Sequence, residues 1–137
     1  MSTSGFELTV AVSDDFVRGL LCSAFEGGSN YWYHNLRVGT LPEGTARADF
    51  SGGGRMQPDD TYWHWCQLIP VAGGTVLFDD TEESATYTLG RPQLLQGLRV
   101  MQTKHPQHWG NAIMQNGDAE TGDIFLQCCV FGNVIYG

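Results

Sequence analysis

The apolar positions of the first part of the chain predict a strand followed by a helix. Apolar side chains take every second position of residues 6–12, which predicts a strand with one buried face. Over residues 16–24 the apolar side chains recur three or four positions apart, and this spacing predicts a helix. Ser13 or Asp14 can cap its start, and Gly27–Gly28 should end it.

The middle of the chain predicts strands and one long loop. Four β-favouring stretches predict strands, of which the second and third form a hairpin: the surroundings of Leu36 and Val38, and residues 61–69, 75–78 and 86–89. Residues 39–60 are rich in glycine and proline and predict a surface loop. Residues 79–83 carry four carboxylates, and we expect a solvated acidic loop there.

The last third of the chain is helical in pattern. Pro92 suits the first turn of a helix that ends near Lys104, and a short helix should follow Pro106. Asp118 can cap a final helix that Gly132 ends, and residues 134–136 predict a short edge strand. Together these elements predict a single α+β domain, residues 1–137. We expect a small antiparallel or mixed sheet with an N-terminal helix and a C-terminal helical group on one face.

Composition and charge disfavour several classes of function. The chain has 137 residues, and seven basic against fifteen acidic residues give a net charge of −8, which disfavours generic nucleic-acid binding. It has no apolar run of about 18 residues and no signal-like start. We therefore expect no membrane insertion and a cytoplasmic protein. Its four cysteines form no C-x-x-C pair, so neither a disulfide scaffold nor a zinc site is expected.

The first candidate site is the segment Glu26–Tyr33. Glycines let a backbone approach a ligand closely, and neighbouring aromatic rings can stack on a planar ligand. The segment supplies these candidates: Glu26, Gly27, Gly28, Ser29, Asn30, Tyr31, Trp32 and Tyr33. They suit a nucleobase or nucleotide-like ligand. The alternative is that the glycines only end a helix and the aromatic side chains belong to the core.

The second candidate is the start of the final helix. Asp123 and Gln127 are four positions apart and share a helix face. Gly122 costs about 1 kcal/mol within a helix, so we expect a packing or contact reason for it. We expect this face and the Glu26–Tyr33 segment to meet at the rim of one pocket. The alternative is an acid-rich first turn that only complements the helix dipole.

The third candidate is His64, in the stretch Tyr62–Cys66. In a strand His64 would share one face with Tyr62 and Cys66, and that face could line a pocket. A structural role for His64 is the alternative, since the sequence names no partner for it. His105 and His108 flank Pro106 without a nearby carboxylate and are a weak metal motif.

The sequence carries no motif of a known catalytic machinery. It lacks G-x-S-x-G, a Walker glycine loop and H-E-x-x-H. We therefore expect no catalytic residues, no cofactor and no metal, and a protein that binds its ligand unchanged.

Both ends of the chain resemble a family of small phage and prophage proteins of unassigned function. The resemblance lies in Leu21–Tyr33, in Asp118–Cys129, and in the following Phe131–Gly132 and Ile135–Gly137. It implies a protein of the host bacterial cytosol. By analogy, such proteins block host defence by sequestering a nucleotide signal or by covering a defence protein.

These observations predict a non-enzymatic homo-oligomer that binds a nucleotide-like ligand, as a sponge for a host immune signal. The alternative is an acidic inhibitor that binds a host defence protein by nucleic-acid mimicry. Hydrolysis of a nucleotide signal is a third hypothesis.

Overall fold

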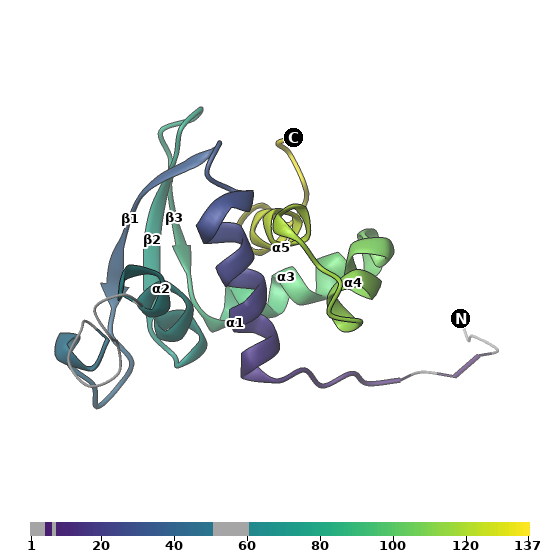
Figure 1. Ribbon diagram of the computed structural model, residues 1–137, viewed down its shortest axis with the longest axis horizontal. Helices are drawn as coiled ribbons and strands as arrows, with labels where there is room; N and C mark the ends of the chain where they lie inside the picture. Colours follow the sequence, from purple (N-terminus) through teal and green to yellow (C-terminus); the bar gives the residue numbers. More distant parts are fainter. Residues whose placement is uncertain (1–4, 7, 51–60) are drawn as a thin grey trace.

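A computed structural model shows helices packed against one side of a small sheet (Figure 1). It describes residues 5, 6, 8–50 and 61–137, without the side chains of residues 61–64. Over these ranges five α-helices and three strands follow in the order α1 (Asp14–Ser23), β1 (Tyr33–Thr40), α2 (Thr61–Val71), β2 (Thr75–Asp80), β3 (Thr86–Leu89), α3 (Arg91–Lys104), α4 (Pro106–Ile113) and α5 (Ala119–Phe131). The predicted α+β class, with a C-terminal helical group, is confirmed.

The first helix forms as the sequence predicts. The Ser13 hydroxyl accepts a hydrogen bond from the backbone N–H of Phe16 at 3.1 Å, so a cap occupies the predicted start of α1. One face of α1 is buried through Val17, Leu20 and Leu21. After Ser23 the chain continues into a π-helical turn, Ala24–Gly28, which leads it toward the sheet.

The sheet is antiparallel, in the order β1-β2-β3. Val76, Phe78 and Asp80 of β2 are fully buried, and their neighbours along the strand are only partly buried. Phe78 contacts the rings of Phe25 and Trp32, each with a centroid distance of 5.8 Å. The buried face of β2 therefore joins the sheet to the segment that follows α1.

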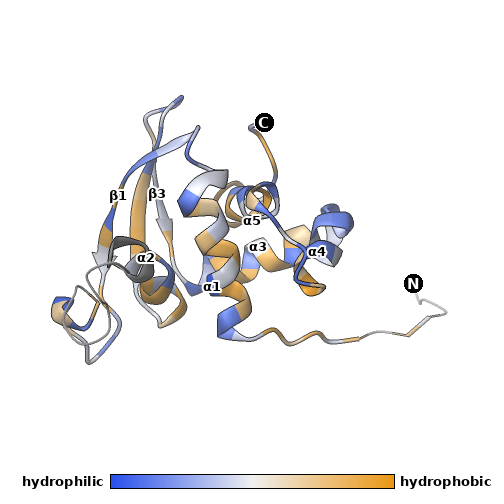
Figure 2. Ribbon diagram, in the orientation of Figure 1, coloured by the Kyte–Doolittle hydropathy of each residue, from blue (hydrophilic) through white to orange (hydrophobic). Residues whose placement is uncertain are grey.

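The final helix is the centre of the helical layer. Asp118 caps α5 by accepting a hydrogen bond from the backbone N–H of Thr121 at 3.1 Å, and Gly132 ends it with φ 71°. Eight residues of α5 are buried, because the helix packs against α1, α3 and β3. In Figure 2 the ribbon of α1 carries hydrophobic positions, and Leu20 and Leu21 of this helix and Leu94 and Met101 of α3 are buried.

Three predicted strands are wrong. Residues 61–71 form helix α2, so β2 pairs with β1 and not with this segment. β-branched and aromatic residues favour strands only where a pairing partner exists; here Cys66 and Ile69, three positions apart, turn one helix face into the core. The described part of residues 6–12 lies in no strand, nor do residues 134–136.

The predicted solvated acidic loop is also partly wrong. Asp79 and Asp80 belong to β2, and Asp80 is completely buried. The turn itself exposes only Glu82 and Glu83 of the four carboxylates, because the other two accept hydrogen bonds from neighbouring strands and from the last residues of the chain.

Helix α5 crosses the end of α1 at Gly122. A Cβ atom added there would lie 2.6 Å from the backbone nitrogen of Ala24 and 2.6 Å from the Cβ of Ser23. This close approach is the packing reason that the sequence analysis expected. It brings the segment after α1 alongside the next residue of α5, Asp123.

We therefore expect Gly122→Ala to destabilise the protein by about 1–3 kcal/mol, the usual range for overpacking. Gly19→Ala is the control, because nothing lies within 4 Å of a Cβ at Gly19 in α1; it should gain up to about 1 kcal/mol of helix propensity. Urea unfolding measures both. Equal stabilities for the two variants would contradict the close approach of α1 and α5.

Candidate binding site

The two predicted motifs meet at the carboxylate of Asp123. Its Oδ1 accepts hydrogen bonds from the Ser29 hydroxyl and the Trp32 indole N–H, both at 2.8 Å. Its Oδ2 accepts from the Tyr31 hydroxyl at 2.6 Å and from the Gln127 amide at 3.2 Å. Four neutral donors therefore surround a carboxylate that is only 6% exposed.

The backbone of the segment after α1 and its packing on α5 explain why these side chains converge. Asp123 and Gln127 lie four positions apart on one face of the helix, as predicted. Gly28 fits against the carbonyl group of Ala119, where a Cβ atom would collide. Residues 29–32 then turn back over α5, with the backbone N–H groups of Trp32 and Tyr33 bonded to the Ser29 carbonyl at 3.1 and 3.2 Å.

The carboxylate affects the chemistry of Tyr31. Partial burial, and then the hydrogen bond to Asp123, raise the pKa of Tyr31 to about 12. Tyr31 therefore stays a neutral donor at physiological pH. Its ring is 52% exposed and forms the accessible border of the cluster.

The other predicted residues of the first motif do not join Asp123. Glu26, Gly27 and Asn30 are exposed, and Glu26 bonds to the thiol of Cys22. The Tyr33 hydroxyl donates to the backbone carbonyl of Phe25 at 2.8 Å, and its ring is buried, so Tyr33 belongs to the core.

His64 lies in helix α2, and its side chain is outside the described residues. The predicted strand on which the His64 argument depends is wrong, because residues 61–71 form this helix.

One face of the Trp32 indole, which the sequence predicted to stack on a ligand, is covered by the chain's own Tyr136. The Tyr136 ring stacks on Trp32 with a centroid distance of 5.6 Å and an interplanar angle of 23°. Phe131 packs against the same indole at 5.1 Å. Trp32 is consequently 1% exposed, and a second ring could stack on this face only after Tyr136 left.

A second buried carboxylate, which the sequence analysis missed, lies at the other edge of Tyr136. Asp80 accepts hydrogen bonds from the Tyr136 hydroxyl at 2.7 and 2.9 Å and from the Tyr87 hydroxyl at 3.1 Å. The backbone N–H groups of Glu82 and Glu83 donate to it at 2.7 and 3.3 Å. The only sequence signal is the alternation of Val76, Phe78 and Asp80, which puts all three on one strand face.

These bonds decide the ionisation of Asp80. Burial by itself raises the pKa of this carboxyl, but the hydrogen bonds from Tyr136, from the two backbone N–H groups and from Tyr87 outweigh it, so the pKa lies below its ordinary value of 3.8. The hydrogen bonds to Asp80, followed by its burial, raise the pKa of Tyr136 above the ordinary value. An ionised Asp80 and a neutral Tyr136 therefore stabilise one another.

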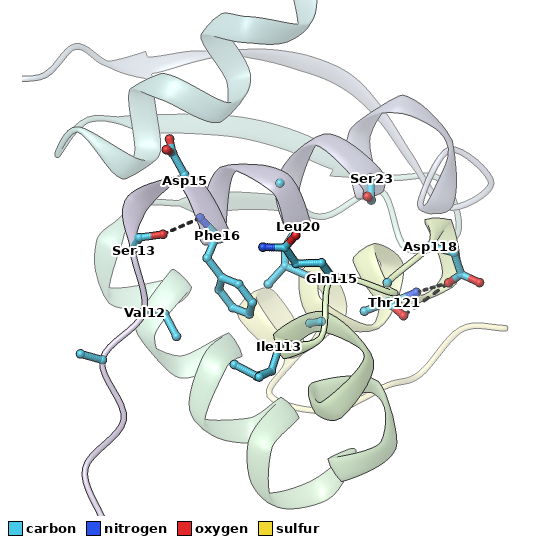
Figure 3. A pocket seen from close by; sticks show the side chains of 14 residues that line it. Val12, Ser13, Asp15, Phe16, Leu20, Ser23, Ile113, Gln115, Asp118 and Thr121 are labelled. Carbon is cyan, nitrogen blue, oxygen red and sulfur yellow. Dashed lines mark hydrogen bonds between the residues drawn. The ribbon is translucent and has the colours of Figure 1, made fainter.

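The cavities lie elsewhere in the molecule. One of about 490 Å³ lies between residues 11–13, α1 and the α4–α5 connection. In Figure 3 Phe16, Leu20 and Ile113 border it. Two of its polar residues, Ser13 and Asp118, cap α1 and α5, and the rest of the lining mixes apolar residues with Asp15, Ser23, Gln115 and Thr121. A ligand there would be recognised by shape and apolar contact.

A second cavity, of about 800 Å³, separates residues 8–12 from α3. Its lining is mostly apolar and includes Leu8, Val10, Val17, Leu94, Leu95, Leu98 and Trp109, with Arg91 and Arg99 among the polar residues. Neither cavity is lined by Trp32 or Asp123, so neither of the two cavities joins the predicted site.

The described residues were also compared with the geometry of a metal centre and the length of a membrane span. No three histidine, cysteine or acidic side chains converge there in a way that could hold a metal ion. None of the helices in these ranges is both long and apolar enough to span a bilayer. All four cysteines are free thiols.

Comparison of the chain with protein-family models, with curated proteins and with solved structures gave no match. The resemblance to phage proteins therefore stays a prediction, and function must be argued from the geometry.

The first prediction concerns the Asp123 cluster. Asp123→Asn presents an NH₂ group to two of the four donors, and we expect a loss of about 1–3 kcal/mol because buried donors lose their acceptor. Glu120→Gln is the matched control on the same helix; it is exposed and should change stability by less than about 0.5 kcal/mol. Urea unfolding with similar losses in both variants would show that the cluster contributes nothing specific.

The second prediction concerns acid stability. Because the folded pKa of Asp80 lies below 3.8, its contribution is present above that value and is lost as the pH falls through the folded pKa. Asp80→Asn should be less stable than the wild type by about 1–3 kcal/mol near pH 7, and the difference should shrink by about pH 3. Chemical unfolding at both pH values measures it, with exposed Glu82→Gln as control. A difference independent of pH would contradict the assignment.

Proposed function

We propose that this chain is a non-enzymatic interaction protein that self-associates through its N-terminal arm, defined as residues 5, 6 and 8–12. The observation that carries the proposal is the exposure of its apolar side chains. Phe6 is 100% exposed, Leu8 87% and Val10 50%. Figures 1 and 2 show the arm leading away from the body before α1. Alternating apolar residues in an extended segment are typical of a strand or arm that is buried on a partner.

The body offers an apolar surface next to the arm. The 800 Å³ cavity separates the arm from α3, so the arm does not fill the groove beside it. Leu95 in this groove is 48% exposed, and Ile113 and Met114 at the end of α4 are 46% and 71% exposed. Most of the exposed large apolar side chains in the described residues therefore gather at this end of the molecule.

A second copy is the partner that this chemistry favours. Each copy carries both an apolar arm and an unfilled apolar groove, so two copies related by a two-fold axis can exchange arms and bury both. Arg91, Arg99 and Asp14 give the groove a charged border around its apolar lining, and Arg91 lies 3.8 Å from Asp14.

The acidic alternative has less support. Asp79 accepts a hydrogen bond from Arg37 at 3.1 Å, and Asp80 is buried, so half of the acidic cluster is not presented to a basic partner. Nucleotide binding at Trp32 remains a prediction that requires movement of Tyr136.

The test is the mass of the protein in solution. By light scattering after gel filtration we expect a wild-type dimer. Leu8→Asp and Leu95→Asp should each raise the dimer dissociation constant at least about tenfold, since burial of a leucine contributes roughly 1.5–3 kcal/mol. Thr88→Asp is the control, because it adds the same charge at an exposed position of β3.

Mixing the two variants tests the exchange itself. Leu8→Asp supplies an intact groove and Leu95→Asp an intact arm, so a mixed dimer regains one complete contact. Partial recovery of the dimer is expected. A wild-type monomer at high concentration, no recovery on mixing, or loss of the dimer only in Thr88→Asp would each contradict arm exchange.

A further inference from the structure

The last residues of the chain are bound as a short peptide would be. Residues 133–137, here called the tail, follow Gly132 and lie in no helix or strand. The Gln127 Oε1 accepts hydrogen bonds from the backbone N–H groups of Ile135 and Tyr136, both at 2.8 Å. The Gln127 Nε2 donates to the Tyr136 carbonyl at 3.3 Å. One amide side chain thus satisfies three backbone groups of two consecutive residues.

The tyrosine of the tail occupies a built site. Trp32 forms its floor, in the stacked arrangement given above, and Phe131 forms a wall with a centroid distance of 5.8 Å and an angle of 71° to the Tyr136 ring. Asp80 lies at the far end of the site, where it accepts a hydrogen bond from the Tyr136 hydroxyl. Ring stacking, edge contact and a hydrogen bond to a carboxylate together specify a tyrosine better than a phenylalanine.

The carboxylate at the end of the site indicates recognition. In the described part of the chain Asp80 forms no ion pair with a basic side chain, although it is completely buried. Burial of a charge without a cation is costly unless donors surround it. Two of its donors are backbone groups of its own turn, and the Tyr136 hydroxyl makes the shortest side-chain bond to it.

The tail is held by few contacts besides these. Ile135 is 55% exposed, and Tyr136 is partly buried. The tail pairs with no strand, so its release would break the three bonds to Gln127, the bonds of the Tyr136 hydroxyl to Asp80, and the packing of Val134 and the Tyr136 ring against the core. The pairing of the three strands does not involve the tail.

We propose that the groove formed by Trp32, Phe131, Asp80 and Gln127 is a binding site for a short peptide segment that carries a tyrosine, and that the tail is its intramolecular occupant. The class of ligand follows from the three kinds of contact: backbone groups on Gln127, a ring on Trp32, and a hydroxyl on Asp80. A tyrosine-bearing segment of a partner protein would displace the tail and expose it. This inference does not depend on exchange of the N-terminal arms.

The test uses full-length Tyr136→Ala, which empties the ring site. The probe is the peptide Asn-Val-Ile-Tyr-Gly with a fluorophore at its N-terminus, and fluorescence anisotropy measures binding. We expect saturable binding to Tyr136→Ala and at least about tenfold weaker binding to the wild type, whose tethered tail competes at a high effective concentration. Ile135→Ala is the control variant; it keeps Tyr136 and should resemble the wild type.

A second peptide, Asn-Val-Ile-Phe-Gly, tests the role of Asp80. Without the hydroxyl we expect about tenfold weaker binding to Tyr136→Ala, as a hydrogen bond to a charged group is lost. Circular dichroism tests whether Tyr136→Ala is folded. If it is not, Tyr136→Phe serves instead: its tethered phenylalanine lacks the bond to Asp80, so the tyrosine peptide should displace it and bind this variant more tightly than the wild type.

Three results would overturn the proposal. The first is a folded variant that does not bind the tyrosine peptide. The second is equal binding of the tyrosine and phenylalanine peptides. The third is binding of adenosine, included as a probe, without binding of the peptide, which would assign the groove to a free planar ligand.

Discussion

The structure depends on the burial of one carboxylate, Asp123, which forms no ion pair with a basic side chain within the described residues. A buried charge is tolerated only where hydrogen-bond donors replace water, and Asp123 is surrounded by donors from Ser29, Tyr31, Trp32 and Gln127. Three of these four donors lie more than 90 positions away in sequence. The need to satisfy this charge therefore fixes the segment after α1 to helix α5 and sets the position of the Trp32 indole.

A second carboxylate repeats this arrangement at the sheet. Asp80 is held by hydroxyl groups and backbone N–H groups, and Tyr136 connects the two centres, because its ring lies on Trp32 while its backbone is bound by Gln127. The two centres share partners, so changes in one should be felt at the other. Asp80 and Asp123 therefore have a structural role, because each holds distant segments together.

The two proposed interaction sites differ in their physical basis. The arm and its groove are apolar and unfilled, so association there is driven by the area removed from water. The groove formed by Trp32, Phe131, Asp80 and Gln127 is already occupied by the tail and is specific through polar contacts. A ligand must therefore compete with a tethered segment. A nucleotide-like ligand, which the aromatic motif predicted, would have to displace the Tyr136 ring from Trp32.

The sequence by itself determined the elements whose signals are local. The caps at Ser13 and Asp118, the end of α5 at Gly132 and the helical spacing within α1, α3 and α5 depend on neighbours a few residues apart, and so does the pair of Asp123 and Gln127 on one helix face. The close packing at Gly122 is a contact with the end of α1, far away in sequence. Only the tertiary structure decided what each apolar or polar face contacts. Residues 61–71 became a helix because β2 found β1 and β3 as partners. Asp80 became buried, and Tyr136 took the ring position on Trp32, because contacts between distant segments have no signature in a single sequence.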